Sequence, residues 1–425
     1  MTDICFIYLP HPYLKRPDAQ LPMGILMLAG MIRKNGRYSV EVKNYSSWSF
    51  INAIMNLPEA KVYGITMTSM EIPSAQAFAR QIKLRYPESK VIVGGPGTVT
   101  PELVEMPMID MIVQGEADYE IIDLIEDVIN GDNGYYWCAP PRDLDDLPYP
   151  ARDMIDGSMG GDVFAYNKHY KGKQSTVILS SRGCPFECAF CAAPKLADTV
   201  RYRSVDSVVG EMKHVIKEYG IKQFRFSDDL FTFPSKRALE MCEGIGPLDV
   251  AWRVSARVKP LKKEVVQAMK DAGCKEFSFG IESFDDNVLS LLNKRATAQD
   301  NVEALEMCAE VGIGARILLM IGTPGQTPKT IELNKKYISE VPHTIVSCTS
   351  FIPIPGSDVW YHPDEYDIEI LSRDMRDYNF YFFGPNGVND LKPVIKMKDR
   401  PLDEFVEESR DFRQWLFERE DVNRG

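Results

Sequence analysis

Short apolar runs alternate with helical patterns along most of the chain, and this alternation restricts the fold more than any other feature of the sequence. In the amino-terminal part, strands are expected at 4–9, 39–45, 61–69, 90–95 and 108–116, with helices at 23–36, 74–87 and 118–130. Strands that alternate with helices in this way form a parallel sheet covered on both faces. The pattern therefore predicts a doubly wound, Rossmann-like α/β domain.

A second series of the same kind begins near residue 174. Its expected strands cover 175–181, 223–229, 250–257, 276–283, 315–322 and 344–351. A helix over 204–220 follows the first of them, with Ser204 as its cap and Gly220 at its end. Six strands joined by helical crossovers indicate a partial (β/α)6 TIM-like barrel, with its chemistry at the carboxyl ends of the strands.

The periodicity fades between about 131 and 172, where Pro, Gly and Asp are frequent. Such a composition is typical of a linker. We therefore expect a first domain over 1–135, a linker over 136–172, a barrel over 173–365 and a C-terminal cap or substrate-binding region over 366–425. The aromatic stretch YNFYFFG (378–384) is interpreted as core in preference to a pocket lining, since such rings bury large areas.

Charge and cysteine usage exclude several classes of protein. The net charge of −12 disfavours nonspecific binding to nucleic acid or to anionic membranes, and no apolar run is long enough to span a bilayer. The first residues, MTDICFIYLP, favour a buried strand over a signal peptide. Nine cysteines without a disulfide pattern favour a reducing cytoplasm. Six of them are expected to be small buried hydrophobes: Cys5, Cys138, Cys242, Cys274, Cys308 and Cys348.

The other three cysteines lie close together in RGCPFECAFCAAPK (182–195). Cys184, Cys188 and Cys191 are spaced C-x3-C-x2-C on a loop that follows an expected strand. Thiolates suit iron–sulfur chemistry, and three ligands on four irons leave one iron open for reaction. A structural zinc site would need a fourth ligand, and neither His169 nor His214 is at a suitable spacing. The pattern predicts a 4Fe–4S cluster with one free iron.

The stretch CPFECAFC resembles the signature of the radical S-adenosylmethionine (SAM) superfamily, in which an aromatic residue such as Phe190 precedes the third cysteine. The resemblance implies that the open iron chelates SAM and that the reduced cluster cleaves it to a 5′-deoxyadenosyl radical. It also implies a SAM contact at Phe190 and further SAM contacts in FSDD, SAR, FGIES and IGTPGQT. Those further residues are Ser227, Asp228, Asp229, Arg257, Glu282, Ser283 and Gly322. Gln326 stands where glutamate is commoner and receives no role. Taken singly, these residues are also compatible with helix caps and turns.

In the first domain, the loops after the third, fourth and fifth strands carry hydroxyls and glycines at the edge where a doubly wound sheet binds nucleotide-like ligands. LPMGILMLAG, the Gly-Gly-Pro strand end and VQGE resemble the cobalamin-binding domain fused to many radical SAM enzymes. The implied cobalamin contacts are Thr66, Thr68, Ser69, Gly94, Gly95, Pro96, Gly97, Gln114, Gly115 and Glu116.

Two departures from that domain concern cobalt. Gly97 replaces a common histidine, and the Asp-x-His-x-x-Gly sequence that supplies a lower axial ligand is absent. His11 lies outside that context and is interpreted as a loop histidine with a partner in the protein, not as a cobalt ligand. The departures suggest water, or nothing, on the lower face of the cobalt.

The resemblance implies a cobalamin-dependent radical SAM methyltransferase that acts on an unactivated carbon. Such a carbon has no useful pKa, so the protein's task is to position two cofactors and a substrate and to exclude water. The alternatives are a radical cyclisation, rearrangement or C–C coupling without methyl donation, a first domain that binds no cobalamin, and a non-catalytic iron–sulfur or zinc protein. The expected partners are a small-molecule or peptide substrate and a reductant such as flavodoxin or ferredoxin, with nucleic acid disfavoured.

Overall fold

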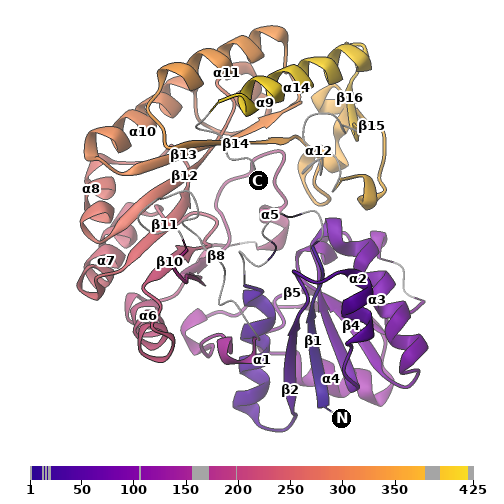
Figure 1. Cartoon of the computed structure of the whole chain (residues 1–425). Coiled ribbons are helices and arrows are strands. Elements are labelled where there is room, and N and C mark those ends of the chain that lie inside the picture. Colours follow the sequence, from indigo (N-terminus) through magenta and orange to yellow (C-terminus); the bar gives the residue numbers. More distant parts are fainter. Residues whose placement is uncertain are drawn as a thin grey trace. The chain divides into compact units, whose positions relative to one another are not determined.

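The computed structural model describes residues 2–11, 14, 17, 21–104, 107–155, 172–197, 199–378 and 393–419. The chain divides into two compact units. The first comprises Met1–Val177 with Lys195–Ala197, and the second comprises Ile178–Pro194 with Asp198–Gly425. Each unit contains one large sheet flanked by helices (Figure 1).

The first unit is built on a six-stranded sheet in the order β2-β1-β3-β4-β5-β6, and its strand pairs are parallel. Its strands are β1 (Thr2–Tyr8), β2 (Val40–Asn44), β3 (Ala60–Thr66), β4 (Lys90–Gly94), β5 (Met111–Gly115) and β6 (Gly134–Cys138). Its helices are α1 (Met23–Asn35), α2 (Phe50–Met55), α3 (Ile72–Arg85) and α4 (Ile121–Asn130). This order confirms the doubly wound fold, and it reverses between β1 and β3, where ligands bind in open sheets of this type.

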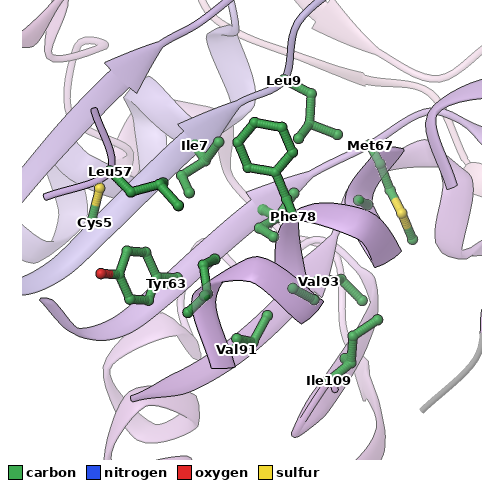
Figure 2. Close-up of a cluster of buried hydrophobic side chains, with 14 of the residues drawn as sticks. Cys5, Ile7, Leu9, Leu57, Tyr63, Met67, Phe78, Val91, Val93 and Ile109 are labelled. Carbon is green, nitrogen blue, oxygen red and sulfur yellow. The ribbon is translucent and has the colours of Figure 1, made fainter. Parts of the chain in front are cut away.

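The core of this unit lies between the sheet and α3. Figure 2 shows Phe78 of α3 over strand residues such as Ile7 and Tyr63, within a cluster of fully buried side chains. Cys5 belongs to the same cluster, and burial raises the pKa of its thiol, as expected for a cysteine that behaves as a small hydrophobe. Of the other scattered cysteines, Cys138, Cys242, Cys274 and Cys308 are also buried, and Cys348 is partly buried.

The strand β6 corrects the expected linker over 136–172, because residues 136–138 pair with β5. The strand lies at the edge of the sheet, and Tyr135 and Trp137 on it are exposed. The strand is only five residues long and lies between stretches rich in Gly, Pro and Asp, so the sequence predicts its short aromatic run as part of a linker. Short 3-10 turns follow at Leu144–Asp146 and Arg152–Met154, and residues 156–171 of the expected linker lie outside the described residues.

The second unit is built on a six-stranded parallel sheet in the order β14-β13-β12-β11-β10-β7. Its strands are β7 (Thr176–Ile178), β10 (Gln223–Phe226), β11 (Ala251–Ala256), β12 (Cys274–Glu282), β13 (Gly314–Ile321) and β14 (Ile345–Ser350). Its helices include α6 (Val205–Tyr219), α7 (Ser235–Ile245), α8 (Lys263–Asp271), α9 (Asp286–Leu291), α10 (Ala298–Val311) and α11 (Pro328–Glu340). Every expected strand of the partial barrel is present, and Ser204 and Gly220 cap α6 as predicted.

The two faces of this second sheet differ sharply in composition. One face carries large side chains that are fully buried, including Phe224, Trp252, Phe277 and Phe279. Trp252 Nε1 donates to the Ala272 carbonyl oxygen at 2.8 Å, next to the end of α8. The opposite face carries polar and charged residues, which are described further below.

Smaller elements surround the second sheet. The hairpin of β8 (Ser181–Arg182) and β9 (Arg201–Tyr202) is antiparallel, as is that of β15 (Ile368–Ile370) and β16 (Ile395–Met397). The remaining helices are α5 (Ala193–Leu196), α12 (Asp358–Tyr361) and α14 (Leu402–Phe417). Apart from the buried Tyr378, the aromatic stretch 378–384 lies outside the described residues. Among the described helices, none combines the length and hydropathy that a bilayer crossing requires.

Candidate functional site

The three-cysteine loop follows β8 and is held by backbone contacts to distant parts of the second unit. The Ala189 N–H donates to the Leu292 carbonyl at 3.0 Å, and the Ala189 carbonyl accepts from the Val359 N–H at 3.1 Å. Asn293 Nδ2 donates to the Glu187 carbonyl at 2.7 Å. These contacts position a loop that has almost no regular hydrogen bonding of its own.

The loop presents three free thiols, of which Cys188 is buried. Burial, with smaller contributions from the nearby Cys188, Asp229 and Cys184, raises the pKa of Cys191 to about 11. Burial also raises the pKa of Cys184, with contributions from Asp229 and Cys188. The thiols of Cys184 and Cys191 are therefore protonated at neutral pH in the absence of metal, and they would release protons on binding it.

Within the described residues, no three His, Cys, Asp or Glu side chains converge on a point that suits a single metal ion. A cubane cluster needs a different arrangement, since each cysteine binds its own iron. A set of three close thiols without histidine fits that chemistry.

Arg257 follows β11 and lies directly against the loop. Its Nη1 is 3.0 Å from Cys188 Sγ, its guanidinium carbon is 4.0 Å from the centre of the Phe186 ring, and its Nη2 donates to the Lys294 carbonyl. The side chain is buried. The predicted SAM contact thus borders a predicted cluster ligand, where its positive charge would stabilise a thiolate.

Lys294 was not singled out by the sequence, yet it belongs to this site. Its buried Nζ donates to Glu282 Oε1 at 2.8 Å and lies 5.8 Å from the centre of the Phe190 ring. Glu282 has φ +63°, and Asn293 and Arg295 on either side of Lys294 have φ +49° and +52°. Left-handed backbone at non-glycine residues is costly and gathers at functional sites. Only Asn293 carried a sequence signal, since Asn tolerates this conformation best.

The two aspartates of FSDD have different environments. Asp228 is buried, and its carboxylate accepts from the Ser180 N–H at 2.8 Å and from Ser181 Oγ at 2.6 Å. Burial raises the pKa of Asp228, and these hydrogen bonds oppose the rise. Asp228 thereby fixes the strand that enters the cysteine loop. Asp229 is exposed, so its carboxylate is the more accessible of the two for a ligand.

The other predicted SAM residues fall into two groups. Ser227 and Phe190 are partly exposed, and the Ser227 N–H donates to the Ile178 carbonyl at 2.9 Å. Ser283 is buried, and its Oγ lies 3.4 Å from Asn334 Oδ1 and accepts from the Asp285 N–H at 3.1 Å. Ser283 therefore has structural partners that compete with any ligand.

Gly322 ends β13 with φ +79°, and its N–H donates to Gln326 Oε1 at 2.7 Å. Gln326 Nε2 in turn donates to Glu408 Oε2 of α14 at 3.2 Å. The amide of Gln326 can accept from the Gly322 N–H and also donate to Glu408, whereas a glutamate in its place would put a second negative charge beside Glu408. The glutamine that departs from the commoner sequence thus has a structural explanation.

In the first unit, the three predicted cobalamin loops meet at the carboxyl edge of the sheet. The Met67 N–H donates to the Gly94 carbonyl at 3.0 Å, and the Gly97 N–H donates to the Met67 carbonyl at 2.8 Å. A Cβ on Gly97 would lie 2.7 Å from the Thr68 carbonyl oxygen. Gly95 has φ +91°, and a Cβ there would lie 2.6 Å from Thr66 Oγ1. Gly97 is therefore required by the close approach of two loops.

The remaining predicted contacts lie in the same loops. Thr98 Oγ1 donates across to the Val113 carbonyl at 2.9 Å, and Gln114 Nε2 donates to the Thr98 carbonyl at 2.6 Å. Gly115 has φ +83° and passes so close to the Cys138 carbonyl that no side chain fits. Pro96 begins a 3-10 turn, Ser69 is buried, and Glu116 follows the end of β5.

His11 lies beyond the end of β1 and forms a buried pair with Glu71. Its Nδ1 is 2.6 Å from Glu71 Oε1, and Glu71 Oε2 accepts from the Thr68 N–H at 2.6 Å. The pair joins the loop after β1 to the loop after β3, which is a sufficient structural role for both residues. These loops present backbone amides, hydroxyls and an accessible Gly94 edge, a donor set that fits a large polar cofactor.

Comparison with known families assigns both units. The model of the B12 binding domain matches residues 15–125, and the model of the radical SAM superfamily matches residues 178–337. The chain is a radical SAM enzyme with a B12-binding domain. This class uses a 4Fe–4S cluster, SAM and cobalamin, which confirms the predicted cofactors.

Relatives of this radical SAM enzyme include methyltransferases and cyclases. It is 29% identical over 403 residues to an uncharacterised methyltransferase of Pyrococcus horikoshii, covering 89% of this chain and 83% of that protein. It is 25% identical over 391 residues to an anaerobic magnesium-protoporphyrin IX monomethyl ester cyclase of Rubrivivax gelatinosus, covering 84% of this chain and 68% of that one.

Among solved structures, the methyltransferase TsrM of Kitasatospora setae, with tryptophan and a SAM analogue bound, has a TM-score of 0.70. The alignment covers 99% of this chain and 91% of that one at 16% identity, a likeness that concerns the fold alone.

Proposed function

We propose that this radical SAM enzyme is a cobalamin-dependent methyltransferase that acts on an unactivated carbon of a small molecule. One observation carries the proposal: the same chain contains a loop of three cysteines, without a fourth cysteine, and a B12-binding domain. The methyltransferases among its relatives support methyl transfer as the outcome. When bound, the cofactors supply a substrate-directed radical and a methyl carrier.

The residues of the chain have distinct roles in this proposal. Cys184, Cys188 and Cys191 hold the cluster, and Arg257 holds positive charge beside Cys188. Asp229 is the acceptor for the SAM ammonium, because both oxygens of Asp228 are engaged by Ser180 and Ser181.

Three further SAM contacts follow from their placement. Glu282, held by Lys294, faces a polar group of SAM. Ser227 offers its hydroxyl and Gly322 its carbonyl, since the N–H groups of both residues donate within the protein. The loops at 66–69, 94–97 and 114–116 hold cobalamin. A low-potential carrier such as flavodoxin or ferredoxin supplies the electron.

A second function is radical cyclisation without methyl donation, which the similarity to the Rubrivivax cyclase supports. The products of SAM distinguish the two. Anaerobically reconstituted protein with cobalamin, SAM and reductant should form S-adenosylhomocysteine in an amount that matches the bound cobalamin, together with 5′-deoxyadenosine. Formation of 5′-deoxyadenosine alone would exclude methyl transfer and favour the second function.

A further inference from the structure

Four charged residues lie at neighbouring positions on four adjacent strands in the second unit, three of them in register and the fourth two residues further along. Arg225 of β10 pairs in register with Arg253 of β11, which pairs with Glu276 of β12. On β13, Arg316 pairs with Ser278, two residues after Glu276. Paired residues of parallel strands, and residues two apart on one strand, point to the same face of a sheet. All four side chains therefore lie on one face, opposite Trp252 and Phe277.

Glu276 holds two of these arginines through a single oxygen. Arg253 Nη1 is 3.4 Å and Arg316 Nη2 is 3.3 Å from Glu276 Oε1. Arg225 has no carboxylate partner within the part of the chain that the structure describes. Among the described residues, Glu276 is thus the carboxylate that Arg253 and Arg316 share, next to the third guanidinium group of Arg225.

The three guanidinium groups are close enough to repel one another. Burial, together with the charges of Arg225 and Arg316 and against the opposing charge of Glu276, lowers the pKa of Arg253 to about 9. Burial and Arg316 lower the pKa of Arg225. Arg253 remains charged at neutral pH. An arrangement of positive charges in a poorly solvated place is costly unless an anion compensates it.

The rest of this face is less tightly buried than the opposite face. Towards the carboxyl ends of the strands it carries small or partly exposed residues, among them Ser255, Gly280, Leu318 and Ser347, whereas Val254, Phe279 and Ile317 on the other face are buried. Arg257, which touches Cys188, is four residues beyond Arg253 on the same chain segment, about 13 Å at the rise of a strand. A molecule bound to the arginines would thus extend towards the cysteine loop.

We propose that Arg225, Arg253 and Arg316 bind an anionic group of the substrate, a phosphate or a carboxylate, on the inner face of the second sheet. The planar fork of each guanidinium matches the oxygens of either group. The anion anchors the substrate so that the rest of the molecule extends towards the cysteine loop. This proposal rests on the proposed function in one respect, because it takes the anion to be part of the substrate of the methyltransferase. Binding of the anion to the three arginines can be measured separately.

The experiment is anaerobic isothermal titration of the holoenzyme, loaded with cluster, cobalamin and SAM, with inorganic phosphate in one arm and malonate in the other. Binding of phosphate alone indicates a phosphorylated substrate, and binding of malonate alone indicates a carboxylate. Arg225→Gln should lower the affinity for whichever anion binds by about tenfold. The control Arg376→Gln, an exposed arginine paired with Asp374, should leave binding unchanged.

Glu276→Gln separates anion binding from a purely structural charge network. Removal of the carboxylate frees two guanidinium groups, so anion affinity should rise even if the thermal stability falls. If Arg225→Gln fails to fold, Arg225→Lys takes its place. Arg225→Lys should also weaken anion binding, because lysine lacks the planar, two-pronged guanidinium group. The proposal is overturned by the absence of binding in both arms, or by equal affinity in wild type and the Arg225 variants. Formation of S-adenosylhomocysteine without substrate is independent of these titrations, so the two proposals can fail separately.

Discussion

Lys294 and Glu282 form a buried ion pair next to the cysteine loop. Each charge needs the other as its partner, because neither is well solvated in this position. Lys294→Met leaves Glu282 buried without its partner and should lower the free energy of unfolding by about 3–5 kcal/mol. Denaturant unfolding of the metal-free protein measures this loss. The exposed pair Lys262–Glu264 provides the control, since Lys262→Met should cost less than about 1 kcal/mol. Equal losses in both variants would contradict the role of burial.

Arg257 tests the electrostatics of the cluster at the same scale. Arg257→Gln removes a positive charge beside Cys188, so the oxidised, less negative cluster gains relative stability and the midpoint potential should become more negative. A redox titration followed by EPR measures the shift. Arg295→Gln is a matched control, because this exposed arginine lies 3.6 Å from Glu187 of the same loop. An unchanged potential in Arg257→Gln would show that the guanidinium leaves Cys188 once the cluster is bound.

At the scale of single residues, the sequence predicted what local spacing determines. The three cysteines were found because they are close in the chain and their chemistry is distinctive. Lys294 was missed because its partner Glu282 and its neighbour Phe190 are distant in sequence. The predicted pair Asp228 and Asp229 could not be resolved either, since only the packing shows that Asp228 is engaged by Ser180 and Ser181.

At the scale of elements, the strands of both sheets were predictable because buried parallel strands form continuous apolar runs. The exception was β6, an edge strand. The contact between the end of β13 and α14 was also invisible, since it depends on Gln326 bridging Gly322 and Glu408. Each of these failures concerns an element whose partner is set by tertiary structure.

Gln326→Glu should therefore loosen α14. The substitution loses the donor to Glu408 and places two carboxylates together in a buried position, at a cost of about 1–3 kcal/mol. Hydrogen exchange of 402–417 should accelerate. Gln299 of α10 donates to Glu303 at 3.0 Å on the exposed surface, so Gln299→Glu should leave exchange unchanged. Unaltered protection of α14 in Gln326→Glu would show that the bridge does not hold it.

The loop pair at the carboxyl edge of the first sheet gives a matched comparison of two glycines. Gly97→Ala places a Cβ 2.7 Å from the Thr68 carbonyl oxygen, whereas a Cβ on Gly94 has nothing nearer than 3.7 Å. Gly97→Ala should displace the loop after β3 and reduce retained cobalamin, measured by the corrinoid absorption of the purified protein. Gly94→Ala should affect packing little. Loss of cobalamin in Gly94→Ala alone would place the cofactor against that glycine instead.

At the scale of the whole molecule, the two proposed cofactor sites belong to compact units with separate sheets, so damage to one site should leave the other cofactor bound. Cys188→Ala should abolish the cluster absorption and SAM cleavage while the corrinoid band remains. Gly97→Ala should reduce the corrinoid band, while the cluster spectrum and the formation of 5′-deoxyadenosine persist. Each sheet has its own core, which makes independent loading the physical expectation. Simultaneous loss of both cofactors in either variant would contradict it, because one unit would then depend on the other for its fold.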